Sequence, residues 1–419
     1  MNHYQIKDLI NSKRYKDVIN YFSDDNNKLC TEWDYYFFSL ALWKEKEYER
    51  GRLISREGII RFPMFEMVRS PYCWCLYYLY IREFDGNNEV DFKRAVDSIL
   101  KFSKQEIYTP YERTIWKMVD WLKSKTGIHA DDIDFYLSLI NPNMLSDQPY
   151  TLRVDGKNQE IESKREKWYS LKSSALLQKK DYEGCKKICQ EALSSFQKLH
   201  HDNDIWFQYR SAVADMELGN LEKAENNLNK LLVYKEHWIF YYCLFRIYIS
   251  QKKLNNAIRM ASAVMLSGGE YKSKVKFLEE FADFLKQIGY IDESFFHLSF
   301  AVKLREENNW KLKESLLYNL KLFHKPSLES KELLSNLRKF WIANRHINEK
   351  KHYGHIESLL TNNKAGFILS DKGEKYYFRF PWKQKDSYII GSAVEYYIKD
   401  SFDKKRQRIS KEAIDVRVI

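Results

Sequence analysis

A helical hairpin pattern that recurs along most of the chain constrains its fold more than any other sequence feature. In each copy, an aromatic-rich helix is followed by a short turn, and a small residue lies near the start of a second helix. The small residue lets the two helices approach closely, while aromatic side chains at helical spacing fill the groove between them. Because one hairpin cannot bury its apolar face alone, we expect the copies to stack on their neighbours. Clear copies occupy residues 35–63, 169–193, 207–232, 239–265 and 277–302.

The small residues recur at a nearly regular interval, because Cys185, Ala224, Ala257 and Ser294 are 39, 33 and 37 residues apart. Over roughly residues 4–305 the pattern resembles tetratricopeptide repeats, whose unit is about 34 residues long. The resemblance implies a mainly α-helical solenoid whose concave face binds a protein partner. It implies no catalytic chemistry.

The domain organisation follows from where this pattern weakens. The copies are irregular between about residues 66 and 160, and a stretch rich in Pro, Asp and Gly at 141–156 interrupts them. We therefore predict two blocks of tetratricopeptide-like repeats, at residues 1–145 and 160–309. A basic helical connector is expected at residues 310–351.

Composition and charge narrow the classes of fold and partner. The 14 Gly and 7 Pro residues amount to about half or less of average usage, which disfavours all-β folds and Gly-rich nucleotide-binding folds. Residues 310–419 hold 23 Lys and Arg against 13 Asp and Glu, whereas the first 309 residues hold 46 against 45. An excess confined to one region favours a polyanionic partner such as nucleic acid. The alternative, a general bias toward lysine, would also make the first 309 residues basic.

The periodicity changes from helical to alternating near residue 353, which predicts a small β-domain at 352–419. Its candidate strands are short and rich in β-branched and aromatic residues, and turn residues separate them. Five such strands suit a closed five-stranded barrel of the OB-fold type. The expected strands are residues 354–360, 366–370, 375–380, 393–402 and 413–419.

Glycines and aromatic residues follow a fixed order through this region. The segments are Gly354-His355-Ile356, Lys364-Ala365-Gly366-Phe367-Ile368, Tyr376-Tyr377-Phe378-Arg379-Phe380, Gly391-Ser392-Ala393-Val394-Glu395-Tyr396 and Ala413-Ile414-Asp415-Val416. Together they resemble a cold-shock domain, a family that binds single-stranded RNA or DNA on an aromatic platform.

The resemblance implies a binding site for unpaired nucleic acid. Phe367, Tyr377 and Phe380 would form the platform, and Arg379 takes the place of the family's histidine. The remaining basic residues would meet phosphates; they are Lys364, Lys383, Lys385, Lys404, Lys405, Arg406 and Arg408.

Two observations leave a second interpretation open. Ser358 and Leu359 stand where the family has first-strand aromatic residues, and Ala365 replaces the first Phe of the Gly-Phe-Gly-Phe motif. Strand alternation places Tyr377 and Arg379 on one face, which fits a stacking face without proving its use. The alternative is a pure protein-interaction scaffold, or a subunit of a larger complex, whose barrel has lost nucleic-acid binding.

Other clusters of reactive residues are weaker candidates for a site. His352 and His355 lack ligands at metal spacing and are expected to be loop residues, and the polar run 200–204 is expected to be a solvated loop. The cysteine pairs 73/75 and 185/189 are expected in the core. No phosphate-binding loop, nucleophile elbow or zinc-protease motif occurs. We therefore predict no catalytic residue, metal, cofactor or small-molecule substrate, with an unrecognised nuclease as the remaining enzymatic hypothesis.

The sequence thus predicts a non-enzymatic adaptor. Its barrel would bind single-stranded nucleic acid, RNA in preference to DNA, and its solenoid would bind a protein. A bacterial defence or RNA-regulation system is one setting that suits this architecture. The chain has no apolar run of the roughly 18 residues of a membrane span, no leader-like N-terminus and no disulfide framework. A cytoplasmic location without membrane contact is therefore expected.

Overall fold

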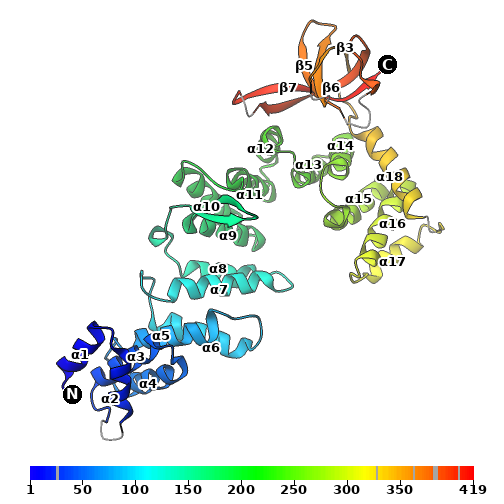
Figure 1. Cartoon of the computed structure of the whole chain (residues 1–419). Coiled ribbons are helices and arrows are strands. Elements are labelled where there is room, and N and C mark those ends of the chain that lie inside the picture. Colours follow the sequence, from blue (N-terminus) through cyan, green and yellow to red (C-terminus); the bar gives the residue numbers. More distant parts are fainter. Residues whose placement is uncertain (25–27, 327–328, 362–363, 381–385, 404–405) are drawn as a thin grey trace. The chain divides into compact units, whose positions relative to one another are not determined.

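The computed structural model describes residues 1–24, 28–326, 329–361, 364–380, 386–403 and 406–419. Over these residues the chain forms α-helices α1 to α18, a two-stranded sheet and a closed five-stranded barrel (Figure 1). The chain divides into two compact units, Met1–Asn203 and Asp204–Ile419. The predicted fold class, tetratricopeptide-like helical repeats followed by a small β-barrel, is confirmed.

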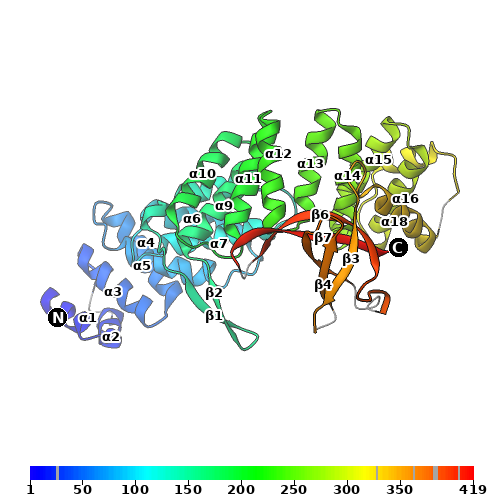
Figure 2. The same cartoon turned by 90° about the horizontal axis from the view of Figure 1, so that it is seen from above.

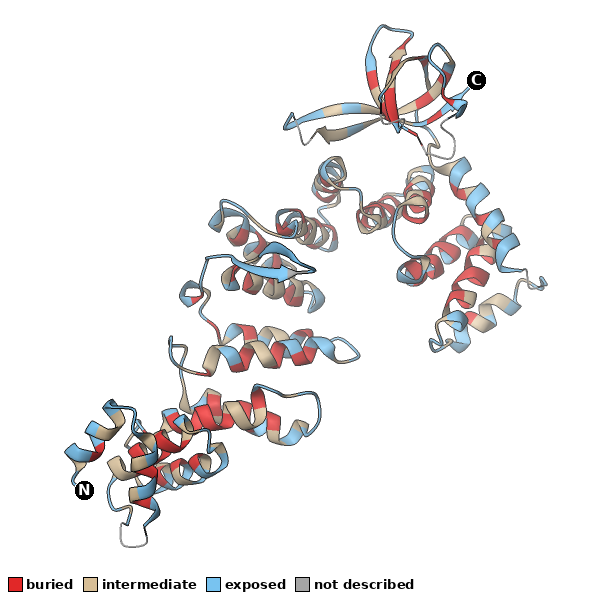
Figure 3. Cartoon of the chain, in the orientation of Figure 1, coloured by how far each residue is buried: buried red, intermediate tan, exposed pale blue. Residues whose placement is uncertain are grey.

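The first unit consists of helical hairpins and one β-hairpin. Its α-helices are α1 (His3–Asn11), α2 (Tyr15–Ser23), α3 (Glu32–Lys44), α4 (Tyr48–Arg61), α5 (Arg69–Leu76), α6 (Glu89–Phe102), α7 (Tyr111–Ser124), α8 (Ala130–Ser138), α9 (Lys164–Gln178) and α10 (Tyr182–Ser195). A π-helical turn η1 (Tyr77–Ile81) extends α5, and a 3₁₀ turn η2 (Pro142–Met144) follows α8. Strands β1 (Tyr150–Val154) and β2 (Lys157–Ile161) form an antiparallel hairpin that is largely exposed (Figure 3).

Glycines in α4 show why small residues matter in these hairpins. A Cβ added to Gly58 would lie 2.8 Å from the Cβ of Tyr35 on α3. A Cβ added to Gly51 would lie 2.8 Å from the Sγ of Cys75 on α5. Both distances are too short for a carbon contact, so the neighbouring helices can approach α4 this closely only at glycine.

The second unit continues the hairpins with α11 (Asn203–Glu217), α12 (Leu221–Tyr234), α13 (Trp238–Ser250), α14 (Leu254–Leu266), α15 (Val275–Gln287), α16 (Ile291–Glu307), α17 (Glu314–Lys321) and α18 (Ser330–Asn344). A 3₁₀ turn, η3 (Tyr271–Lys274), precedes α15. The predicted small residues Ala224 and Ala257 are completely buried between paired helices. Ser294 is also buried, and its hydroxyl donates a 2.7 Å hydrogen bond to the carbonyl of Ala282 on α15.

Helix α18 packs against α14 and α16 through a buried tryptophan and histidine. The indole N–H of Trp341 donates to Nε2 of His297 at 2.8 Å, and Nδ1 of His297 lies 2.6 Å from the carbonyl of Glu293. These two bonds fix the neutral tautomer with its proton on Nδ1. Burial lowers the pKa of His297 to about 4.

We expect His297 to make the second unit sensitive to acid. The unfolded chain would bind a proton at His297 below about pH 6.5, while the folded chain binds it only near pH 4. Stability from this group is therefore present above pH 6.5 and falls by about 3 kcal/mol as the pH drops to 4. Urea unfolding at several pH values measures this dependence. In His297→Leu the dependence should be weaker, and an unchanged slope would exclude His297 as its source.

The barrel consists of β3 (His352–Leu359), β4 (Ala365–Ser370), β5 (Lys375–Arg379), β6 (Ala393–Asp403) and β7 (Arg408–Val418). Its order is β3-β4-β5-β7-β6, closed by pairing of β3 with β6. Only β5 and β7 run parallel among these described pairs, which gives the strand order of an OB-fold. The interior is filled by Ile356, Ile368, Phe378, Val394 and Tyr396, all of them fully buried.

Strands β6 and β7 hold the barrel against the helices of the second unit. The ring of Tyr397 on β6 stacks on His346, with centroids 3.8 Å apart and planes 10° apart. Asp415 on β7 accepts from Arg345 at 3.0 Å and from Nε2 of His346 at 2.5 Å. Lys399 pairs with Glu236 at 2.9 Å. This docking leaves β3 and β4 on the side of the barrel away from α12 to α14 (Figure 2).

Protonation of His346 is expected to strengthen this docking. Burial opposes the charge, but hydrogen bonds to Asp415 and Glu349 outweigh it and raise the pKa of His346. The stabilisation of the docked barrel by charged His346 is therefore present below the ordinary histidine pKa. It is lost as the pH rises through the raised pKa of His346. Asp415→Asn should weaken the docking by about 1–3 kcal/mol, measured by hydrogen exchange along β6 and β7. The exposed Asp386→Asn is the control, and equal exchange in both variants would contradict the assignment.

Candidate nucleic-acid interface

Two of the predicted platform rings meet on the outer face of the barrel. Phe367 on β4 lies directly opposite Tyr377 on β5 in the antiparallel register. Both rings are half-buried, with centroids 5.8 Å apart and planes 66° apart. Their neighbours Ile368 and Phe378 point into the core, so alternation along the strands leaves the rings outside.

Two cations lie over these rings. The Nζ of Lys375 is 5.0 Å from the ring centroid of Phe367, and the guanidinium of Arg379 is 5.7 Å from that of Tyr377. Arg379 is exposed as well. The sequence prediction missed Lys375, although it precedes Tyr377 by two residues on the same strand and alternation places both on one face.

The neighbouring strands limit the width of this aromatic face. Ser358 on β3 lies opposite Phe367, and Glu412 on β7 lies opposite Tyr377. Lys375 also forms an ion pair with Glu357 on β3. The face therefore carries two rings and two cations, bordered by a serine and by carboxylates. A pair of rings with cations above them is suited to stacking unpaired bases.

The prediction that Phe380 belongs to this platform is wrong. Its side chain is only 6% exposed and lies in the barrel core, stacked on Tyr388 with centroids 4.8 Å apart. Alternation explains the difference, because position 380 shares the inward parity of Tyr376 and Phe378.

The predicted phosphate contacts are spread over the barrel. Lys364 is exposed and lies at the same end of the sheet as Arg379, since its carbonyl accepts from the backbone N–H of Phe380 at 3.2 Å. Arg406 and Arg408 are exposed at the β6–β7 turn. Arg408 precedes Glu412 on β7 by four residues, or about 13 Å. Because β5 and β7 run parallel and Glu412 lies opposite Tyr377, Arg408 lies toward the start of β5 and away from Arg379. Lys383, Lys385, Lys404 and Lys405 lie outside the described residues.

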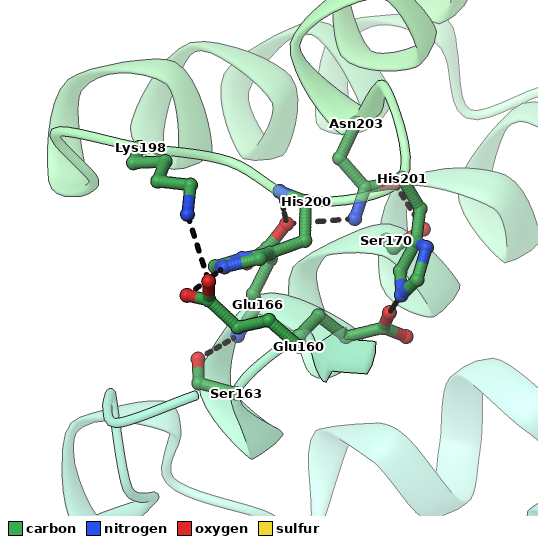
Figure 4. Close-up of polar contacts among 9 residues, drawn as sticks. Glu160, Ser163, Glu166, Ser170, Lys198, His200, His201 and Asn203 are labelled. Carbon is green, nitrogen blue, oxygen red and sulfur yellow. Dashed lines mark hydrogen bonds and ion pairs between the residues drawn. The ribbon is translucent and has the colours of Figure 1, made fainter. Parts of the chain in front are cut away.

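The polar run at 200–204 is exposed at residues 201, 202 and 204, as expected of a solvated loop, but His200 and Asn203 belong to a hydrogen-bonded cluster (Figure 4). The buried carboxylate of Glu166 on α9 accepts from the backbone N–H of His200 at 2.7 Å and from the Asn203 amide at 2.9 Å. The two ring nitrogens of His200 contact Glu166 at 2.8 Å and Glu160 of β2 at 2.9 Å. The cluster thereby fastens the β1–β2 hairpin to the loop before α11.

This geometry favours the protonated form of His200 and disfavours a role as metal ligand. The hydrogen bond to Glu166 is the main cause that raises the pKa of His200. Both ring nitrogens are used by carboxylates, so neither lone pair is directed at a cation. Among the described residues, no group of three or more His, Cys, Asp or Glu side chains is arranged to hold a metal ion.

The structure also gives the positions of the other residues that the sequence analysis rejected as site candidates. The cysteines at 73, 75, 185 and 189 are buried in the helical core, as predicted. His352 and His355 lie in strand β3 and not in a loop. His355 falls within the strand predicted at residues 354–360, and His352 is included because β3 begins two residues earlier. None of the helices in the described ranges combines the length and apolarity needed to traverse a lipid bilayer.

Glu166→Gln should lower the pKa of His200 while the fold is retained. A neutral amide still accepts the two N–H bonds of the loop but no longer stabilises the imidazolium. An NMR titration of the histidine ring protons measures the change. The control is Glu162→Gln, which removes the 2.9 Å partner of His201 and should leave His200 unaffected. A His200 pKa that is the same in wild type and Glu166→Gln would contradict this account.

Comparisons with known proteins assign the chain to no family. No protein-family model matches it, and no curated protein matches it. It is similar to the human IFIT1 dimer with m7Gppp-AAAA, at 11% identity over 83% of this chain and 80% of that chain, with a TM-score of 0.35. It is similar to the human IFIT1 dimer with PPP-AAAA at 10% identity over 82% of this chain and 79% of that chain, with a TM-score of 0.36. It is similar to yeast Tom70 at 11% identity over 82% of this chain and 86% of that chain, with a TM-score of 0.24. These TM-scores are too low to support an inference about fold or function.

Proposed function

We propose that the protein is a non-enzymatic adaptor that binds single-stranded nucleic acid on its barrel and a protein on its helical repeats. The nucleic-acid interface is the outer face of β4 and β5, with Phe367 and Tyr377 as stacking rings. Arg379 and Lys364 supply positive charge at this face, and Lys375 lies over Phe367 while it is paired with Glu357. The observation that carries the proposal is the opposed pair of outward rings with a cation over each.

The chemistry of this face favours unpaired over duplex nucleic acid. Rings can stack only on bases that are free of a helix, and such stacking tolerates many sequences because every base has a π-face. RNA is the proposed ligand in preference to DNA. The platform is smaller than in the cold-shock family, because the first strand lacks aromatic residues and Phe380 points inward. We therefore expect a moderate affinity for nucleic acid.

The protein partner would bind the helical repeats of the second unit. A cavity of about 360 Å³ lies beside α11 and α13, lined by Met216, Leu221 and Ile249 among others. Its polar wall includes the 2.8 Å ion pair between Arg246 and Glu217. A hollow that combines apolar side chains with charged groups suits an inserted protein side chain. Joining two modest interfaces in one chain raises the avidity of the assembly.

The pure scaffold is the second candidate function. It is favoured by the carboxylates beside the rings, because Glu412 opposite Tyr377 and Glu357 beside Lys375 would repel a phosphate backbone. A nuclease remains a third hypothesis, tested by incubating the purified protein with RNA and a divalent metal.

Tyr377→Ala and Phe367→Ala should each weaken binding of a labelled single-stranded RNA by about 5- to 150-fold, the value of one lost stack. Fluorescence anisotropy measures the affinity, and the affinity should fall with added salt. Arg379→Ala should reduce the salt dependence by roughly one phosphate contact.

Tyr318→Ala is the matched control for these variants, because Tyr318 is a 64% exposed tyrosine on α17. It should bind RNA as tightly as the wild type. Equal RNA affinity of Tyr377→Ala, Phe367→Ala and this control would rule out the β4–β5 face as the binding platform. Absence of any RNA binding would favour the second candidate function, the pure protein-interaction scaffold.

A further inference from the structure

The second unit contains another cavity, of about 460 Å³, that the proposed function does not use. It lies where α13, η3, the start of α15 and the residues after α16 meet. Its size is in the range of small-ligand sites. The side chains that matter to its chemistry are Trp238, Tyr242, Lys272, Lys276, Glu280 and Trp310.

Flat aromatic surfaces line this cavity. The rings of Trp238 and Tyr242 are 27° from parallel, with centroids 6.5 Å apart. Trp310 is 41% exposed and has no ring contact with any described residue. An exposed indole beside a cavity offers a π-face to a flat ligand, and burying that face on binding would stabilise the complex.

The cavity also has unneutralised positive charge. Lys276 is exposed and forms no ion pair within the described part of the chain. Lys272 pairs only with the exposed Glu270, at 2.7 Å. A third cation at the cavity, Arg305, is already neutralised by Glu279, with its Nε 2.7 Å from that carboxylate. Lys276 is therefore available to an anionic group such as a phosphate, whereas Lys272 would exchange its exposed partner Glu270 for that group.

Glu280 gives the cavity a fixed hydrogen-bond acceptor. The hydroxyl of Tyr242 lies 2.8 and 2.7 Å from its two oxygens, which holds the carboxylate in place. A carboxylate has further lone pairs that can accept N–H groups.

We infer that this cavity binds a single unpaired nucleotide. Its base would lie against Trp238 and Trp310 and direct N–H groups at Glu280, while Lys272 and Lys276 contact the phosphate. Only a ligand that combines a flat ring, an N–H edge and an anionic group satisfies all three features. The inference extends the proposed function by adding a second nucleic-acid site, but it can be tested independently of the barrel.

The test uses the full chain and nucleoside monophosphates, with binding followed by tryptophan fluorescence and calorimetry. AMP, GMP and CMP should bind more tightly than their nucleosides and more tightly than inorganic phosphate. Trp310→Ala and Lys276→Ala should each weaken monophosphate binding by about tenfold. Lys331→Ala, which removes an exposed lysine from α18, should change nothing.

The barrel variant Tyr377→Ala separates this inference from the proposed function. It should lose affinity for RNA oligonucleotides and keep monophosphate binding at the cavity. Absence of monophosphate binding by the folded wild type would overturn the inference, as would equal binding by Trp310→Ala, Lys276→Ala and the control. Binding of an acidic peptide that requires these two residues, without nucleotide binding, would identify the cavity as a protein site instead.

Discussion

Close approach between the helices is the constraint on which the rest of the structure depends. At Gly51 and Gly58 there is no room for a Cβ, and Ala224 and Ala257 are completely enclosed. Each of these positions brings two backbones near enough for aromatic side chains to fill the remaining groove. The packed hairpins of the second unit then offer a rigid surface to α18 and to the barrel. Without that surface the β6–β7 face of the barrel would have no partner.

The docking of the barrel determines which of its faces can serve a ligand. Tyr397, Lys399 and Asp415 contact residues of the loops beside α12 and α18, so β6 and β7 present part of their outer surface to the protein itself. Phe367 and Tyr377 remain on the outer surface of β4 and β5. The fold therefore assigns the two sides of one small barrel to different tasks, attachment on one side and a ring-and-cation surface on the other.

Local patterns in the sequence were enough to predict the helical hairpins, the five strands of the barrel and the outward position of Tyr377. Strand alternation alone also predicts that Phe380 points inward and that Lys375 points outward. The family resemblance led to a different assignment, because it places aromatic residues on the platform regardless of which face of the strand they occupy. Contacts between segments that are far apart in the sequence could not be predicted, because no local sequence pattern indicates them. The bonds from Glu166 to His200 join residues 34 positions apart, and the stack of His346 on Tyr397 depends on tertiary packing.

The attachment of β6 and β7 to the helices has a geometric consequence. A domain on a loose tether samples many positions, whereas a docked domain keeps one separation from the elements around it. The span from the β4–β5 rings to the hollow beside Trp238 is thus set by the fold of the second unit. A ligand strand shorter than that span would occupy one location at a time, and a longer one could engage both. The protein would in this way distinguish its ligands by length as well as by chemistry.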